Sequence, residues 1–214
     1  MKNIKAFIFD MDGVLLDTES ICQKTWFLAG QKLKLPGAEV LFTKCLGTSR
    51  KDTLALLSKE WGSLEAADKF MEETSHFFTK IEENEGIKVM PYVKECLDFL
   101  KEKYVLALAS STRKEAVYRQ LTAAGLIDYF KTITCGDMVT KSKPDPEIYL
   151  KASKSLNIAP EECFAVEDSP NGVKSAHSAG LNVIMVPDRI PCNEELSKII
   201  YRECKSLKEI TELF

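Results

Sequence analysis

Four acidic residues lie just after two short apolar runs of the sequence. Asp10 and Asp12 follow residues 6–9, and Glu167 and Asp168 follow residues 163–166. Each pair alone has a simpler explanation, because Asp favours turns and acidic residues also cap helices. If both runs are parallel strands, however, all four carboxyl groups meet at the edge of the sheet where the strands end. Their mutual repulsion then requires a cation, and carboxylate oxygens are ligands that Mg²⁺ prefers.

A group of hydroxyl residues and a lysine follow other predicted elements, and both could bind an anion. The hydroxyl residues are Ser110, Ser111 and Thr112, which come after the apolar run 105–109. At a helix N-terminus, hydroxyl and backbone N–H groups can hold a phosphate group. Thr112 is also predicted to cap the following helix, with Glu115 completing a capping box. Lys143 precedes another predicted helix, and a lysine in such a loop is ordinarily solvated.

Five short apolar runs end at polar residues, as is typical of strands buried on both faces of a parallel sheet. They are residues 6–9, 105–109, 163–166 and 183–186, with a weaker fifth run at 129–135. Helical patterns lie between them, at residues 92–103 and 113–124 and after Pro146 and Pro170. This alternation predicts an open α/β fold with a doubly wound parallel sheet.

Residues 16–86 interrupt the alternation, because they show helical periodicity and no convincing strand. This segment of about 70 residues is far longer than the connection of about 2 to 6 residues that usually joins a strand to a helix. We therefore predict an α/β core of residues 1–15 and 87–214, and an inserted helical domain of residues 16–86. The insertion is expected over the carboxyl ends of the strands, where open α/β sheets bind ligands.

The composition excludes several classes of protein. The 214 residues include 29 basic and 32 acidic ones, a net charge of −3, which argues against a nucleic-acid-binding protein. The 7 cysteines contain no C-x-x-C pair, so we expect a reduced cytoplasmic protein rather than a disulfide framework or a zinc ribbon. No apolar run approaches the ~18 residues of a membrane span, so no membrane partner is expected. The oligomeric state is left open, and a monomer is compatible with the sequence.

Four motifs of the chain resemble those of the haloacid dehalogenase (HAD) superfamily and come in the same order. They are the segment from Asp10 to Glu19, the strand end at Ser110, the Lys143-Pro-Asp-Pro segment and the segment from Val166 to Gly172. The helical insertion resembles the α-helical cap of the subgroup that contains β-phosphoglucomutase and small phosphatases. The resemblance covers nearly the whole chain and implies a HAD-like, Rossmann-type core.

The resemblance also implies a role for each motif residue. Asp10 would be the nucleophile that attacks phosphorus, and Asp12 would protonate the leaving oxygen and then activate water. Mg²⁺ would be held by the carboxylate of Asp10, the backbone carbonyl of Asp12 and the carboxylate of Asp168. Glu167 would be adjacent to the metal or bound to it through water. Two further residues would hold the phosphoryl oxygens of the substrate: Ser110 and Lys143.

Two cationic residues of the insertion are candidates for binding the rest of the substrate. Arg50 follows Gly47 and Ser49, and Ser49 is predicted to cap a helix that begins there. In the phosphoglucomutase-like subgroup, an arginine after a similar Gly-x-Ser segment grips the non-reacting phosphate of the substrate, and Arg50 matches it. Lys80 is the second candidate in the insertion.

The second acid of the first motif favours a phosphate ester as the substrate. Family members that dehalogenate or cleave phosphonates lack an acid at the position of Asp12, because their leaving groups need no such proton. Cys22 stands where the mutase has a histidine, and a thiol cannot replace an imidazole in hydrogen bonding. We therefore expect a hydrolase of a sugar phosphate or similar small phosphorylated metabolite, with β-phosphoglucomutase activity as the alternative. A receiver-like phospho-acceptor module is a remote alternative, since such modules have about 120 residues and no cap.

Overall fold

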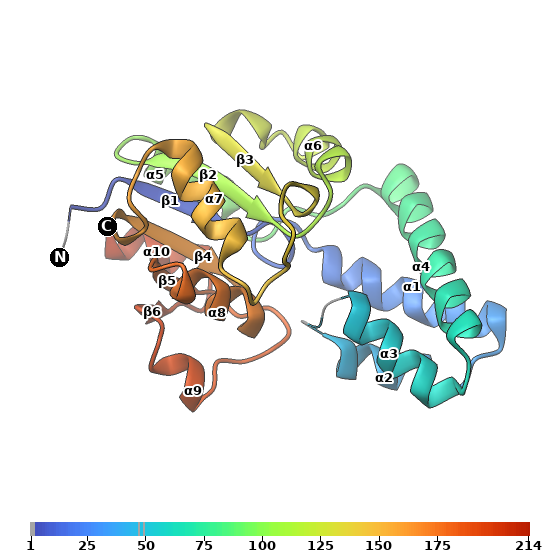
Figure 1. Cartoon of the computed structure of the whole chain (residues 1–214). Helices are drawn as coiled ribbons and strands as arrows, with labels where there is room; N and C mark the ends of the chain where they lie inside the picture. Colours follow the sequence, from blue (N-terminus) through green and yellow to red (C-terminus); the bar gives the residue numbers. More distant parts are fainter. Residues whose placement is uncertain (1–2, 47, 49) are drawn as a thin grey trace. The chain divides into compact units, whose positions relative to one another are not determined.

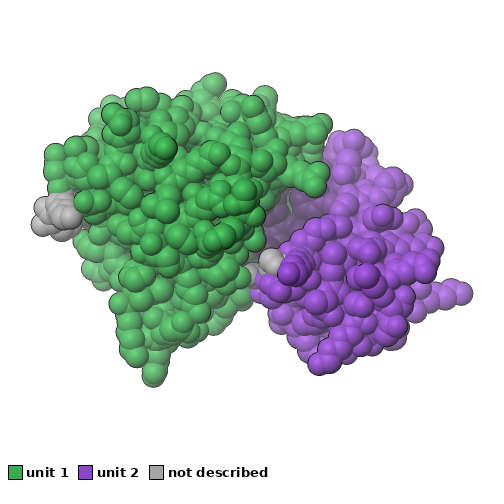
Figure 2. Space-filling view, viewed as in Figure 1, with its two compact units in different colours: residues 1–16, 88–214 green, residues 17–87 purple. Residues whose placement is uncertain are grey.

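The computed structural model describes residues 3–46, 48 and 50–214. The chain divides into two compact units, which Figure 2 colours separately. The core unit consists of Met1–Leu16 and Lys88–Phe214, and the helical unit consists of Asp17–Ile87. Gly47 and Ser49 lie outside the described residues, and so does the predicted cap at Ser49. No helix among the described residues is both long and apolar enough to cross a membrane.

A parallel sheet forms the centre of the core unit. Among the described residues it has six strands, in the order β3-β2-β1-β4-β5-β6. The strands are β1 (Ala6–Phe9), β2 (Val105–Ser110), β3 (Thr132–Cys135), β4 (Cys163–Glu167), β5 (Asn182–Met185) and β6 (Arg202–Glu203). In β1, Phe9 pairs with Leu108 of β2 on one side and with Val166 of β4 on the other. The strand order reverses direction between β1 and β4, which confirms the predicted doubly wound α/β fold.

The predicted strands agree with the structure except at the two ends of the sheet. The weak run 129–135 forms a strand only from Thr132 onward, because Ile127–Tyr129 makes a 3₁₀ turn, η1. β6 was not predicted, since its two residues, Arg202 and Glu203, are both charged and exposed. The edge strand therefore carries no apolar signal, whereas the central strands are buried and apolar.

Helices cover both faces of the sheet (Figure 1). One face is covered by α7 (Glu147–Leu156) and α8 (Pro170–Ser178), and the other by α5 (Val93–Lys101) and α10 (Leu207–Leu213). The other helical elements are α6 (Lys114–Ala123), α9 (Glu194–Ser197), η2 (Gly136–Met138) and η3 (Pro160–Glu162). Both faces are thus removed from water, which explains the nearly continuous apolar runs of the central strands.

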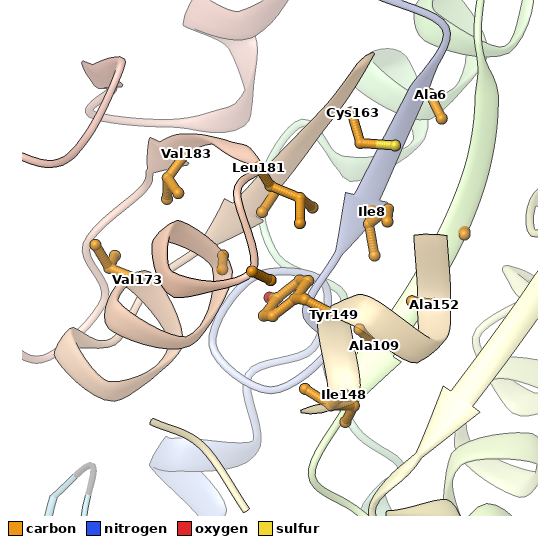
Figure 3. Packing of buried hydrophobic residues seen from close by; sticks show 14 of the residues in the cluster. Ala6, Ile8, Ala109, Ile148, Tyr149, Ala152, Cys163, Val173, Leu181 and Val183 are labelled. Atoms are coloured by element: carbon orange, nitrogen blue, oxygen red, sulfur yellow. The ribbon is translucent and has the colours of Figure 1, made fainter. Parts of the chain in front are cut away.

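The two faces of the sheet carry side chains of different size. The face toward α7 and α8 is lined largely by small residues such as Ala6 and Ala109, which pack in one buried cluster with both helices (Figure 3). On the opposite face, the ring of Phe7 lies 5.2 Å from that of Phe164. Small residues let the two helices approach the strand backbone closely, and this brings α7 and α8 near the ends of β1 and β4.

The helical unit has its own apolar centre. Its helices are α1 (Thr18–Leu33), α2 (Ala38–Cys45), α3 (Arg50–Trp61) and α4 (Leu64–Glu85). Trp26 of α1 packs against Phe42 and Phe70, with ring centroids 5.4 and 5.1 Å away, respectively. Edge-to-face contacts of this kind add to the burial of apolar area, so the unit holds a core that does not depend on the sheet.

The two chain crossings between the units are paired with each other in the core unit. Leu16 forms an antiparallel bridge with Val89, and the backbone N–H of Met90 donates to the carbonyl of Leu15 over 2.9 Å. The chain therefore leaves the core unit and returns to it at adjacent positions.

Candidate active site

The first two acidic residues lie in the loop that follows β1. The backbone N–H of Asp10 donates to the carbonyl of Val166 over 2.9 Å, which extends the pairing of β1 with β4 to the site. The loop then turns sharply at Gly13, where φ is +77° and a Cβ atom would collide with the carboxylate of Asp168. Only glycine fits both this backbone conformation and this close approach. The Asp-x-Asp-Gly segment is thus shaped by its contact with the end of β4.

Three carboxylates converge at the ends of these two central strands. Asp10, Glu167 and Asp168 each place one oxygen in a group whose members all lie within 4.8 Å of one another. Glu167 is fully buried, and Asp10 is 6% exposed. At Gly172, in the first turn of α8, a Cβ atom would overlap the Glu167 carboxylate, so this glycine makes room for it. Three of the four acids predicted to meet at this edge of the sheet therefore form one group within the core unit.

Lys143 lies inside this cluster and is not solvated. Its Nζ atom is 2.6 Å from Oδ1 of Asp10 and 2.6 Å from Oε1 of Glu167. It also donates to the carbonyl of Ala109, at the end of β2, over 3.1 Å. The lysine side chain is 8% exposed. One ammonium group thus connects the ends of β1, β2 and β4.

Burial and charge change the protonation of this cluster. Burial raises the pKa of Asp10 to about 8; the ammonium group of Lys143 opposes this shift, and the charges of Glu167 and Asp12 add to it. Burial alone would lower the pKa of Lys143, but the two carboxylates outweigh burial and raise it, so the lysine stays charged. In the absence of a metal ion, the cluster therefore retains a proton on Asp10 at neutral pH.

The loop that carries Lys143 is fixed by Glu147, at the start of α7. One carboxylate oxygen of Glu147, Oε2, accepts hydrogen bonds from the hydroxyl group of Thr140 over 2.8 Å and from the N–H of Lys141 over 2.9 Å. The other oxygen, Oε1, accepts from the N–H of Thr140 over 2.9 Å. These donors lower the pKa of Glu147. By accepting these hydrogen bonds, the carboxylate holds Thr140 and Lys141 against the start of α7. It thereby fixes the position of the loop that carries Lys143.

Tyr149 is a site residue that the sequence analysis missed. Its hydroxyl group donates to Oε1 of Glu167 over 2.7 Å, and its ring centroid lies 5.0 Å from Nζ of Lys143. Figure 3 shows the ring among Ile8, Val173 and other apolar residues of the cluster. Burial and the neighbouring acids raise the pKa of Tyr149 well above its ordinary value, so the hydroxyl group keeps its proton. A tyrosine on the buried face of a helix needs a partner for its hydroxyl group, and this requirement was the available signal.

Two hydroxyl residues at the end of β2 and just after it contact Asp12. The hydroxyl group of Thr112 donates to Oδ2 of Asp12 over 2.9 Å, and that of Ser110 donates to the same atom over 3.3 Å. The predicted cap at Thr112 is wrong, because α6 has Arg113 at its N-cap with no side-chain capping bond. The carboxylate of Asp137 instead accepts from the N–H of Lys114 over 3.0 Å. Thr112 is thereby available to hold Asp12.

Three predicted site residues remain to be described: Ser111, Arg50 and Lys80. Ser111 is exposed, and its carbonyl lies so close to Gly136 that no side chain would fit there. Arg50 begins α3 and Lys80 lies in α4; both are exposed and belong to the helical unit. Their contact with a substrate stays a prediction.

A buried acid–lysine cluster at the strand-order reversal of a doubly wound sheet defines the class of the protein as an α/β enzyme. The family model described as "Haloacid dehalogenase-like hydrolase" matches residues 7–186. The chain belongs to this family of haloacid dehalogenase-like hydrolases.

Three similar proteins illustrate the range of the family. The phosphorylated carbohydrates phosphatase of Thermotoga maritima is 36% identical over 186 residues, 85% of this chain and 84% of that protein. The beta-phosphoglucomutase of Bacillus subtilis is 27% identical over 190 residues, 86% of this chain and 83% of that protein. The structure of CbbY from Rhodobacter sphaeroides in complex with phosphate has a TM-score of 0.78 and 27% identity, and the match covers 97% of this chain and 96% of that one.

Proposed function

We propose that the protein is a Mg²⁺-dependent phosphomonoester hydrolase that acts on a phosphorylated carbohydrate or similar small metabolite through a phosphorylated Asp10. The observation that carries this proposal is the buried Asp10 carboxyl group, held 2.6 Å from Lys143 within the group of three acids. The names of the relatives support phosphate ester hydrolysis, because the most similar of the three compared is a phosphorylated carbohydrates phosphatase.

The donor set of the cluster fits Mg²⁺. Asp10, Glu167 and Asp168 supply only oxygen ligands, which is the set this ion prefers. With all three acids ionised, the single ammonium group of Lys143 leaves two negative charges, which a divalent cation balances. Asp10, Asp168 and the backbone carbonyl of Asp12 would hold the ion, with Glu167 beside it or bound through water. When bound, the ion would supply positive charge for the phosphoryl oxygens and keep Asp10 ionised.

The substrate needs these positive charges before any chemistry can occur. A phosphate dianion brings two further negative charges to a cluster that is already acidic. At an effective dielectric constant of about 20, one pair of unit charges about 4 Å apart contributes about 4 kcal/mol. Lys143 lies at the position where a phosphoryl oxygen beside Asp10 would find a donor. We therefore assign Lys143 to the transferring phosphoryl group, together with the hydroxyl group of Ser110, which ends β2 directly after the Ala109 carbonyl that Lys143 contacts.

The proposed reaction has two displacements at phosphorus. A carboxylate oxygen of Asp10 forms a bond to phosphorus, and the bond from phosphorus to the leaving oxygen breaks. Asp12, in its protonated form, gives its proton to that oxygen. The resulting carboxylate of Asp12 then takes a proton from a water molecule as the water oxygen attacks phosphorus. The bond between phosphorus and the Asp10 oxygen breaks at the same time, so inorganic phosphate leaves and the carboxylate of Asp10 is restored.

Hydrolysis is favoured over phosphoryl transfer to a second sugar. Cys22 of α1 stands where the mutase subgroup has a histidine, and a thiol does not offer the same hydrogen bonds as an imidazole. The beta-phosphoglucomutase relative is 27% identical, compared with 36% for the phosphatase. β-Phosphoglucomutase activity is therefore the competing outcome of the experiment below.

The test is a panel of phosphomonoesters assayed with Mg²⁺, for the wild type, Asp10→Asn and a control, Asp128→Asn. Asp128 is an exposed acid of η1 outside the cluster. The Asp128→Asn variant should therefore release phosphate at the same rate as the wild type. Asp10→Asn and exhaustive chelation should each abolish phosphate release. Activity retained by Asp10→Asn would disprove the nucleophile assignment. Formation of glucose 6-phosphate from β-glucose 1-phosphate and the 1,6-bisphosphate, faster than phosphate release, would establish the mutase instead.

A further inference from the structure

In this structure, the protons of the Lys143 ammonium group are all engaged in hydrogen bonds within the protein. It carries three protons, and three close oxygen acceptors surround it. They are Oδ1 of Asp10 at 2.6 Å, Oε1 of Glu167 at 2.6 Å and the carbonyl of Ala109 at 3.1 Å. A phosphoryl oxygen can therefore bind Lys143 only if one of these internal bonds is given up.

Breaking an internal bond is costly when it leaves a buried polar atom without a donor. The carboxylate of Glu167 is fully buried, so water cannot replace a lost donor at Oε1. This oxygen has a second donor, however, because the hydroxyl group of Tyr149 lies 2.7 Å from it. If Lys143 turns away, Oε1 keeps a hydrogen bond.

We propose that Tyr149 is a positioning residue that holds Glu167 while Lys143 passes one donor from Oε1 of Glu167 to the phosphoryl group. This inference rests on the proposed phosphatase function. No proton is transferred in this exchange, because Lys143 and Tyr149 both remain hydrogen-bond donors throughout. The hydroxyl group of Tyr149 is also 3.5 Å from Nζ of Lys143, so the two donors are close enough to exchange at one acceptor.

The fold makes Tyr149 suitable for this task. It lies in the first turn of α7, two residues after Glu147, whose carboxylate fixes the loop that carries Lys143. Its ring is enclosed in the apolar cluster between the sheet and helices α7 and α8 (Figure 3). The apolar side chains therefore hold the ring in place, and the hydroxyl group at its end contacts Glu167.

The experiment is Tyr149→Phe, which removes the hydroxyl group and keeps the ring. Without the Tyr149 hydroxyl group as a second donor, Lys143 keeps its hydrogen bond to Glu167. Lys143 then stabilises the phosphoryl group less in the transition state. At saturating Mg²⁺, kcat for p-nitrophenyl phosphate should fall about tenfold or more, as expected for one hydrogen bond to a charged group. KM should change by less than about twofold, because Lys143 passes its donor to the phosphoryl group only in the transition state, so the other contacts of the bound ester are unchanged by the substitution. The affinity for Mg²⁺ alone, from calorimetry, should not weaken.

A matched control is Tyr129→Phe. The hydroxyl group of Tyr129 also donates to a carboxylate, that of Asp98 over 2.9 Å, but outside the site. The kcat, the KM and the Mg²⁺ affinity of this variant should equal those of the wild type. Weaker Mg²⁺ binding by Tyr149→Phe, with kcat restored by excess Mg²⁺, would overturn the proposal, and so would an effect on KM alone.

A double-mutant cycle tests whether Tyr149 acts through Glu167. In the Glu167→Gln background, adding Tyr149→Phe should cost little further activity, because the charged acceptor is already gone. Additive losses would overturn the proposal. An inactive wild type would refute the phosphatase function together with this inference, whereas an active wild type matched by Tyr149→Phe would refute this inference alone.

Discussion

Binding of Mg²⁺ to the core unit should compete with a proton on Asp10. Burial raises the pKa of this carboxyl group to about 8 in the metal-free protein. At pH 7, a group with this pKa is protonated in about nine molecules of ten, and at pH 9 in about one of ten. Since the metal requires the ionised form, binding should release about 0.9 proton at pH 7 and about 0.1 at pH 9. The apparent affinity for Mg²⁺ should fall about tenfold per pH unit below 8.

Isothermal titration calorimetry in buffers of different ionisation enthalpy measures this proton release directly. The Asp10→Asn variant is the control, because it has no proton to lose at this position and should bind Mg²⁺ weakly with no linked release. A Mg²⁺ affinity that does not change between pH 6.5 and 9 in the wild type would refute the reasoning. So would an equal release of protons by the variant.

The same pKa predicts how stability depends on pH without metal. The value in the folded protein lies above the ordinary value of 3.8, so the folded state holds an extra proton between these two limits. The contribution of Asp10 to stability is therefore complete below about pH 4 and is lost as the pH rises through 8. In chelator, the free energy of unfolding of the wild type should therefore fall relative to that of Asp10→Asn as the pH rises over this range. The increase in Tm caused by Mg²⁺ should grow with pH.

Three further substitutions test the contacts around the site. Gly13→Ala should lower the free energy of unfolding by about 1–3 kcal/mol, measured by urea denaturation, because it strains a backbone with positive φ and displaces Asp168; an unchanged protein would contradict this close approach. Glu147→Ala should lower kcat severalfold by releasing the loop of Lys143, and Glu147→Gln, which keeps an acceptor oxygen, should recover most of that loss; equal losses would mean that charge, not loop closure, matters. Arg50→Ala should raise KM for sugar phosphates about tenfold or more while leaving KM for p-nitrophenyl phosphate unchanged, and a parallel change in both would exclude contact with the non-reacting part of the substrate.

The sequence was informative where burial is nearly complete. The central strands are apolar on both faces, so their positions could be predicted to within about one residue from short runs alone. The acids that follow β1 and β4 could be expected to meet, because parallel strands end at one edge of the sheet. Residues far apart in the chain, such as Asp10 and Lys143, became connected only through the family motifs.

Side-chain partners within the site could not be predicted from local patterns. Thr112 has the residue type and spacing of a helix cap, yet its hydroxyl group bonds to Asp12, some 100 residues earlier in the chain. Tyr149 fits the apolar face of its helix, and nothing local shows that its hydroxyl group contacts Glu167. In both cases a long-range partner decides which of two chemically reasonable contacts forms, and local sequence does not encode that choice.

The bridge between Leu16 and Val89 has a consequence for how the chain can fold and change. The bridge joins the two ends of the inserted segment. For the core unit, the insertion is therefore a loop whose ends are already held together. The entropy of closing such a loop grows only slowly with its length, by about 0.6 kcal/mol for each doubling. The segment Asp17–Ile87 can therefore be lengthened, shortened or replaced at little cost to the sheet. Related chains can therefore differ in this insertion while the central strands keep their register.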